Sequence, residues 1–110
     1  MSVAQLFDLR GRKALVTGAS RGIGQAIAIA LAHAGADVAI TARDGASLTE
    51  TSAAITAKGR EAVPLALDVR DVERCRAGVA EAAALLGGLD VLVNNAGYEE
   101  IYPSLDVEEA

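Results

Sequence analysis

A glycine-rich turn near the start of the chain constrains its fold more than any other feature. Residues 17–24 read Thr-Gly-Ala-Ser-Arg-Gly-Ile-Gly, after an apolar run at 14–16 that predicts a buried strand. The apolar residues that follow at helical spacing are Ile23, Ile27, Ala30, Leu31 and Ala34. Glycine lets the backbone approach a ligand closely, and the unpaired N–H groups of a helix's first turn attract anions. The turn therefore predicts a phosphate-binding site for a dinucleotide, although a tight turn without a ligand is the simpler alternative.

The rest of the chain alternates between predicted strands and helices. Strands are expected at residues 13–17, 37–41, 62–67 and 89–93. Helices are expected at residues 22–34, 47–58 and 71–86. This series predicts an α/β, doubly wound Rossmann fold, with a parallel sheet in strand order 3-2-1-4 and helices on both faces. Pro64 suggests an edge position for the third strand, because proline cannot donate a hydrogen bond to a neighbouring strand.

The end of the chain suggests an interruption. We expect residues 1–110 to form a single dinucleotide-binding domain. Asp106 and Glu109 have the spacing of a capping box, yet the chain stops at Ala110. One helical turn is mostly nucleation cost. The sequence thus predicts a domain truncated at the start of a helix, with its C-terminal half missing and the fourth strand left as an exposed apolar edge.

Composition and charge exclude several classes of function. The net charge is −5, and no basic cluster suggests a nucleic-acid partner. No apolar run approaches the roughly 20 residues that span a bilayer. The single cysteine, Cys75, excludes an internal disulfide and a CxxC metal or redox pair. We expect a cytoplasmic protein with no membrane partner and no metal site.

Three segments resemble the signatures of one family, the short-chain dehydrogenases/reductases. Residues 17–24 are similar to its TGxxxGxG signature, and residues 94–97 (Asn-Asn-Ala-Gly) to its NNAG signature. Asp68 and Val69, after the third strand, resemble a third feature of the family. The three segments occur in the family's order, so the resemblance covers essentially the whole chain. The sequence is similar both to 3-oxoacyl-carrier-protein reductases and to gluconate 5-dehydrogenase-like members of the family.

The resemblance implies a nicotinamide dinucleotide bound across the carboxyl ends of the strands. The residues of this chain that fall on the family's cofactor-binding positions are Gly18, Ser20, Arg21, Gly22, Ile23, Gly24, Asp68, Val69, Asn95, Ala96 and Gly97. Those of the glycine-rich turn line the phosphates, and Asp68 falls where a carboxylate accepts from the adenine amino group, with Val69 beside it. Asn95 falls near the nicotinamide-side ribose, whereas Asn94 ties neighbouring strands. Buried amides need hydrogen bonds with or without a ligand, so a structural role stays open for both asparagines.

The tip of the second strand bears on the choice between NAD and NADP. An NAD enzyme has a carboxylate here to accept from the ribose 2′-hydroxyl, whereas this chain has Ala42 followed by Arg43. Arg43 can form a charge-assisted pair with a 2′-phosphate, and Arg21 can add a second positive charge. Asp44 leaves the alternative open, because turned inward it would serve NAD or neutralise Arg43. The sequence predicts NADP, with NAD as the alternative.

The family's reaction is hydride transfer between the nicotinamide ring and a carbonyl or hydroxyl carbon, assisted by a serine and a Tyr-x-x-x-Lys pair. Tyr98 and Tyr102 lack a lysine four residues on. We therefore expect this chain to supply the cofactor-binding part of an NADP-dependent oxidoreductase, to contain no catalytic residue and to be inactive alone. The complete enzyme would act on a small carbonyl or alcohol as a homo-oligomer, commonly a tetramer. The alternative is a stand-alone nucleotide-binding or regulatory module that joins a partner.

Overall fold

The computed structural model of the chain describes residues 8–95. Ala96 and Gly97 of the predicted cofactor site lie outside the described residues. So do Tyr98, Tyr102 and the expected helix start at Asp106.

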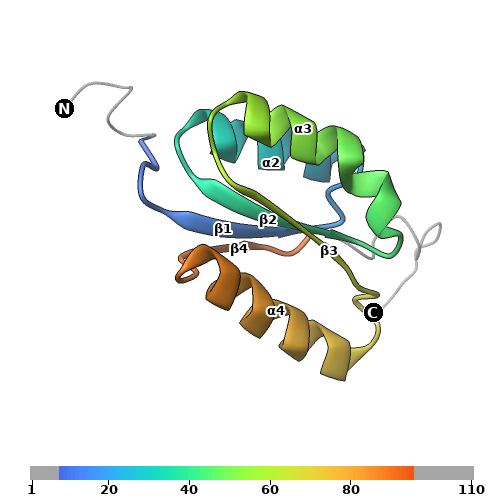
Figure 1. The fold of residues 1–110 in the computed structure, drawn as a ribbon. Helices are drawn as coiled ribbons and strands as arrows, with labels where there is room; N and C mark the ends of the chain where they lie inside the picture. Colours follow the sequence, from blue (N-terminus) through green and yellow to red (C-terminus); the bar gives the residue numbers. More distant parts are fainter. Residues whose placement is uncertain (1–7, 96–110) are drawn as a thin grey trace.

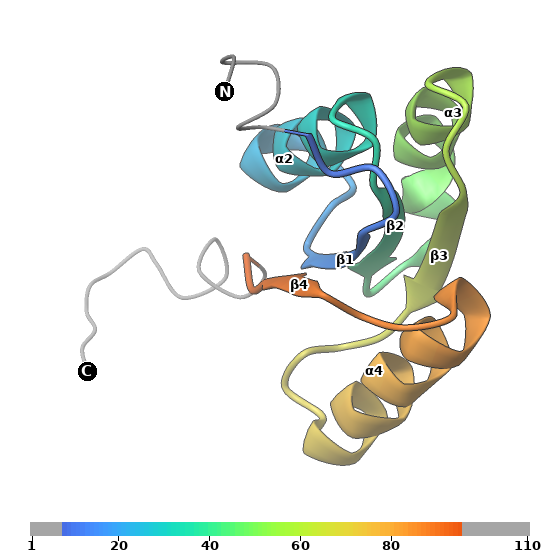
Figure 2. The same ribbon diagram turned by 90° about the vertical axis from the view of Figure 1, so that its left-hand side faces the viewer.

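A sheet of four parallel strands forms the centre of the described chain (Figure 1). The strands are β1 (Lys13–Thr17), β2 (Asp37–Ala42), β3 (Ala62–Ala66) and β4 (Val91–Val93). Their order is β3-β2-β1-β4, so Figure 2 shows β3 and β4 at opposite ends of the sheet. The predicted order 3-2-1-4 is confirmed, and Pro64 lies on an edge strand as expected.

Helices cover both faces of the sheet. Three helices and one 3-10 turn connect the strands, namely α2 (Gly22–His33), η1 (Gly45–Leu48), α3 (Thr49–Ala57) and α4 (Val72–Leu86). α2 and α3 lie on one face and α4 lies on the other (Figures 1 and 2). This arrangement confirms the doubly wound α/β architecture.

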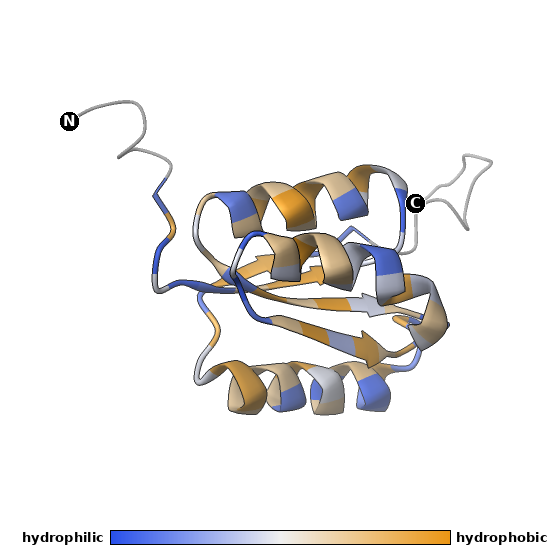
Figure 3. Cartoon of the chain, turned by 45° about the horizontal axis from the view of Figure 1, so that its top comes forward, coloured by the Kyte–Doolittle hydropathy of each residue, from blue (hydrophilic) through white to orange (hydrophobic). Residues whose placement is uncertain are grey.

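Two apolar clusters fill the space between the three layers. Alternate residues of a strand point to opposite faces. Val16, Val38 and Ile40 accordingly pack toward α2 and α3. Leu48 of η1 and Ile55 of α3 complete this fully buried cluster. The second cluster lies on the face that α4 covers and comprises Leu15, Ala39, Val63, Leu65, Ala82 and Leu86. Figure 3 shows the strands as the hydrophobic layer between the helices, as expected of a parallel sheet covered on both faces.

The expected apolar stripe of α2 is wrong in part. Ile23 is 73% exposed, whereas Gly24, Ala28 and Ala32 are the buried residues of the helix. These small residues recur every four positions and therefore form one face. α2 packs on the sheet through this small-residue face, and Ile27 only flanks it.

Side-chain caps shift two helix starts from the predicted positions. The helix expected from Ser47 is preceded by η1, because the Asp44 carboxylate accepts from Ala46 N and starts the winding earlier. The helix expected from Asp71 begins at Val72, because Asp71 is its N-cap and accepts from Arg74 N. Strand ends also differ by one or two residues, since β2 reaches Ala42, β3 ends at Ala66 and β4 starts at Val91.

Candidate functional site

Four loops leave the sheet at its carboxyl edge. Because the strands are parallel, the segments that follow β1, β2, β3 and β4 all start at this edge, where the arrowheads point in Figure 1. These segments carry every described residue of the predicted cofactor site. The structure therefore brings the predicted residues to one edge, in the place where ligands of doubly wound folds bind.

The loop after β1 presents the start of α2 without a cap. Gly18 and Gly22 have φ values of 64° and 62°, in the left-handed region that favours glycine. Arg21 is the N-cap in an extended conformation, makes no side-chain capping hydrogen bond, and no acidic residue stands in the first turn. The first N–H groups of a helix lack intrahelical acceptors and carry the positive end of its dipole. This loop is thus suited to bind an anion.

The same loop is held in place by α3 and β2. Thr51 is fully buried, and its hydroxyl donates to the carbonyl of Ala19 at 2.8 Å. Gln25 Nε2 donates to Thr51 Oγ1 at 3.0 Å, and Ala19 N donates to the Thr41 carbonyl at 3.0 Å. These bonds fix the loop before any ligand arrives, which lowers the ordering cost of binding.

Gly24 is a packing position as well as a member of the glycine-rich turn. A Cβ added there would lie 2.0 Å from the Gly18 carbonyl oxygen and 2.6 Å from Asn95 Nδ2. Backbone atoms cannot yield by that amount, so only glycine lets α2 contact its own loop. The third glycine of the motif therefore allows α2 to pack closely against the loop that contains Gly18.

The two asparagines after β4 connect it to β1 through a hydroxyl. Asn95 N donates to Thr17 Oγ1 at 2.9 Å, and Asn95 Nδ2 donates to the Gly18 carbonyl at 3.1 Å. The Thr17 hydroxyl lies 3.3 Å from Asn94 Oδ1 and 3.4 Å from the Val93 carbonyl, either of which accepts its proton. Both asparagines thus tie strands together, whereas the sequence favoured this role for Asn94 alone.

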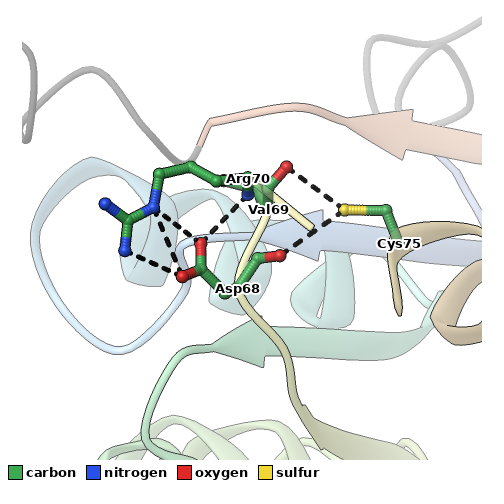
Figure 4. A network of polar contacts seen from close by, with 4 residues as sticks. All are labelled: Asp68, Val69, Arg70 and Cys75. Carbon is green, nitrogen blue, oxygen red and sulfur yellow. Dashed lines mark hydrogen bonds and ion pairs between the residues drawn. The ribbon is translucent and has the colours of Figure 1, made fainter. Parts of the chain in front are cut away.

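Asp68, after β3, forms an ion pair with Arg70 (Figure 4). Arg70 Nε donates to Asp68 Oδ1 at 3.0 Å, and Nη2 donates to Oδ2 at 2.8 Å. The side-chain hydrogen bonds from Arg70, followed by the bond from its backbone N–H, lower the pKa of Asp68 to about 2. The positive charge of Arg43 lowers this pKa further, so Arg43, after β2, lies near enough to Asp68 to influence its charge. Cys75, on α4, donates to the Val69 carbonyl at 3.4 Å.

At the tip of β2, the carboxylate of Asp44 faces its own helix. Asp44 Oδ1 accepts from Ala46 N at 3.0 Å, and the Ser47 hydroxyl donates to the Asp44 carbonyl at 2.6 Å. The side chain thus caps η1, a role that the sequence did not foresee. Arg43, the neighbouring residue, is exposed.

A family model described as short chain dehydrogenase matches residues 12–110. The chain belongs to the short-chain dehydrogenase family. Gluconate 5-dehydrogenase from Gluconobacter oxydans (strain 621H) is 42% identical to this chain over 103 residues, which make up 94% of the chain and 40% of that protein. The chain therefore spans about 40% of the length of this curated relative.

Solved structures agree with the sequence relatives. A protein from Sinorhizobium meliloti 1021, described as a short-chain alcohol dehydrogenase, is 65% identical with a TM-score of 0.84, over 93% of this chain and 40% of that one. Carveol dehydrogenase from Mycobacterium avium, solved in complex with NAD, is 33% identical with a TM-score of 0.77. This match covers 81% of this chain and 36% of the carveol dehydrogenase.

Several residues that support the site could not be recognised from the sequence motifs. Thr51 and Gln25 hold the glycine-rich loop from outside the motif, and Thr17 joins it to β4. Arg70 was also missed, although an arginine two residues after an aspartate is a local signal for an ion pair across a turn. Residues 8–95 contain no group of three His, Cys, Asp or Glu side chains that could hold a metal ion, and none of their helices is long and apolar enough to cross a membrane.

Proposed function

We propose that this chain binds NADP at the carboxyl edge of its sheet and is the cofactor-binding part of an NADP-dependent oxidoreductase. The observation that carries the proposal is the start of α2, which has no side-chain cap. It follows a glycine-rich loop that the hydrogen bond from Thr51 holds in place. A helix N-terminus of this kind suits a pyrophosphate. The family match favours an enzyme over a stand-alone nucleotide-binding or regulatory module.

The residues divide by the part of the dinucleotide that each would hold. The pyrophosphate and adenosine phosphate would be bound by Gly18, Ser20, Arg21, Gly22 and Ile23, with Gly24 shaping their turn. Asp68 and Val69 would bind the adenine. Asn95, Ala96 and Gly97 would line the nicotinamide-side ribose. Ile23 supports this division, since a side chain that is 73% exposed at the loop has apolar surface available for a ligand.

The preference for NADP follows from the charges at the tip of β2. The structure has Ala42 and Arg43 there, and the nearby carboxylate of Asp44 caps η1. A hydrogen bond to a charged group contributes about 1.5–3 kcal/mol. One contact from Arg43 to a 2′-phosphate would favour NADP about tenfold to hundredfold.

The complete protein would act on a small carbonyl or alcohol. When bound, the nicotinamide accepts or supplies the hydride, and the part of the enzyme represented here holds and orients the cofactor. The relative that is a gluconate 5-dehydrogenase suggests a hydroxy acid among the candidate substrates. We further propose a cytoplasmic homo-oligomer, such as a tetramer, for the complete enzyme.

Calorimetric titration of the 110-residue chain with NADPH and NADH tests the proposal. We expect NADPH to bind about tenfold to hundredfold more tightly, and Arg43→Ala to remove this difference while leaving the affinity for NADH unchanged. Arg12→Ala is the matched control, because Arg12 is an exposed arginine just before β1, at the opposite edge of the sheet. Equal affinities for both cofactors would refute the NADP preference, and no binding of either would refute the proposed site.

A carbonyl-reduction assay of the same chain tests the expectation that it lacks catalytic groups. We expect no turnover with NADPH at concentrations that saturate binding. Measurable reduction would show that the 110 residues contain a catalytic group that the sequence reading missed.

A further inference from the structure

A groove lies beside the last turns of α2, toward the end of the helix opposite the glycine-rich loop. Its volume is about 1000 Å³, at the upper end of the range of small-molecule sites. One wall is the segment before β1, where Leu9 N donates to the Ala34 carbonyl at 2.8 Å. The other wall follows α3, where Arg60 Nη1 donates to the Gly35 carbonyl at 3.2 Å. Two separate hydrogen bonds therefore anchor the walls of the groove to the end of α2.

The floor of the groove is apolar. Leu9, Ile27 and Leu31 line it, and each is a partly buried residue that packs against the core cluster under α2 and α3. Ala30 also lines the groove and is exposed. Burial of apolar surface on both partners favours binding. The floor is thus suited to the hydrocarbon part of a ligand.

Positively charged side chains surround this apolar floor. Arg10, Lys58 and Arg60 line the groove, whereas the one carboxylate among the described lining residues, that of Asp8, forms an ion pair with Arg10. Within residues 8–95, Lys58 Nζ makes no hydrogen bond or ion pair, and Arg60 uses Nε and Nη1 but not Nη2. The groove is thus locally positive, although the chain carries a net charge of −5. Lys58 and Arg60 are therefore available to an anion.

The end of α2 offers few acceptors to a competing cation. The carbonyls of Ala30, Leu31 and Ala32 already accept backbone hydrogen bonds of 3.0 Å from residues that follow the helix. The Gly35 carbonyl accepts from Arg60. Among the described residues, the polar groups left to a ligand here are mainly donors with positive charge. This arrangement favours an anion over a cation.

We propose that this groove is a second ligand site, which binds an aliphatic carboxylate of medium chain length. The hydrocarbon tail lies on Leu9, Ile27 and Leu31, and the carboxylate accepts hydrogen bonds from Lys58 and Arg60. The inference goes beyond the proposed function and does not depend on it. The groove lies where α2 ends, at the amino edge of the sheet, whereas the proposed cofactor site lies at the carboxyl edge.

NMR titration of the ¹⁵N-labelled 110-residue chain with octanoate tests the proposal. We expect the largest amide shift changes at Leu9, Ile27, Ala30 and Leu31, and none in the glycine-rich loop. Acetate lacks the tail and should bind about tenfold more weakly or worse, because little apolar surface is buried. The alcohol 1-octanol lacks the charge and should bind about twofold to tenfold more weakly, since the cations are exposed.

Two variants test the charge and the floor separately. Lys58→Ala should weaken octanoate binding about twofold to fivefold and leave 1-octanol unchanged, whereas Lys58→Arg should bind octanoate like the wild type. Ala30→Glu places a carboxylate on the floor and should weaken octanoate binding about tenfold or more. The matched control is Ala80→Glu, because Ala80 is exposed on α4, which covers the other face of the sheet (Figure 1). Circular dichroism spectra and melting curves like those of the wild type would show that the variants are folded.

Several results would overturn the inference. Octanoate might shift no amide, or shift those of β4 instead, and then the groove is not its site. Equal weakening by Ala30→Glu and Ala80→Glu, or no effect of Lys58→Ala on octanoate, would show that the groove does not hold the carboxylate. Nuclear Overhauser contacts from residues 1–7 to Ala30 in the ligand-free chain would make the chain's own first segment the occupant. None of these results bears on the binding of NADP, so the two proposals can fail independently.

Discussion

At the scale of single residues, Gly24 is where one added atom would do most damage. Its missing Cβ is the space into which the Gly18 carbonyl and the Asn95 amide fit. A second helical glycine, Gly78, offers a contrast: a Cβ there would meet Leu67 Cδ2 at 2.5 Å, the far end of a side chain that can rotate. The two glycines are both buried, yet only a Cβ at Gly24 would overlap with backbone atoms, those of the Gly18 carbonyl group.

We therefore predict that Gly24→Ala destabilises the chain and Gly78→Ala does not. Forcing the loop away from α2 should cost about 1–3 kcal/mol, as overpacking does elsewhere. In Gly78→Ala the rotation of Leu67 is offset by about 1 kcal/mol of helix propensity gained. Thermal melts followed by circular dichroism measure both variants. Equal losses in the two would contradict the role given to Gly24.

The residue scale also shows where sequence reasoning reached its limit. The positions of Gly18, Asp68 and Asn95 at the carboxyl edge could be predicted, because strand ends place them there. The hydrogen bond from Thr51 to the Ala19 carbonyl could not, since the two residues lie 32 positions apart and no spacing rule connects them. Direct contact with a cofactor remains a prediction for each of these residues.

At the scale of elements, the opposite edge of the sheet is tied by one carboxylate. Lys13 Nζ donates to Asp37 Oδ2 at 2.7 Å, and Glu61 N donates to Asp37 Oδ1 at 2.9 Å. Asp37 thus joins the starts of β1 and β2 to the residue before β3. The hydrogen bond from Lys13 and that from Glu61 lower the pKa of Asp37.

We predict that Asp37→Asn costs about 1–2 kcal/mol of stability at pH 7, because the amide keeps the shape but loses the charge-assisted bonds. Asp37 has a lowered pKa in the folded chain, so its contribution is complete above the unfolded value of 3.8 and is lost as the pH falls below it. Urea melts at pH 7 and pH 3 should show the difference shrinking at the lower pH. The matched control is Asp8→Asn, because the Asp8–Arg10 pair is exposed and its loss should leave stability nearly unchanged at both pH values. A pH-independent difference would contradict this assignment.

Elements were predicted well where a local signal marks them. Each of the three helices ends close to the predicted position, and Gly35, Gly59 and Gly87, which follow them, have positive φ angles. The failures arose where a side chain competed with the pattern, as when Asp44 began η1 ahead of the expected helix. The buried stripe of α2 was misjudged because apolar periodicity gives weight to isoleucine, whereas close packing on the sheet selected alanine and glycine.

At the scale of the whole molecule, the strand order could be predicted because right-handed crossovers leave few arrangements for four parallel strands. The predicted apolar edge is also found. Within residues 8–95, β4 pairs only with β1, and Leu92 is 58% exposed. Leu92 lies opposite Leu15 in the register, so it lies on the face of the sheet that α4 covers, where α4 packs over β1, β2 and β3.

The chain spans about 40% of a relative such as the gluconate 5-dehydrogenase, so the activity of the complete protein is inferred from the family.

We predict that the 110-residue chain associates with itself through β4, because an apolar edge strand offers unpaired backbone groups to a second chain. Leu92→Lys should weaken this association about tenfold to hundredfold, the cost of leaving one leucine side chain unburied. Sedimentation velocity over a range of concentrations measures the effect. Leu85→Lys is the matched control, since Leu85 is 54% exposed but lies on α4, away from the strand edge. If both variants reduce association equally, general surface hydrophobicity causes the association. If neither variant reduces it, β4 is not the contact. Either result would exclude strand pairing at this edge as the cause of association.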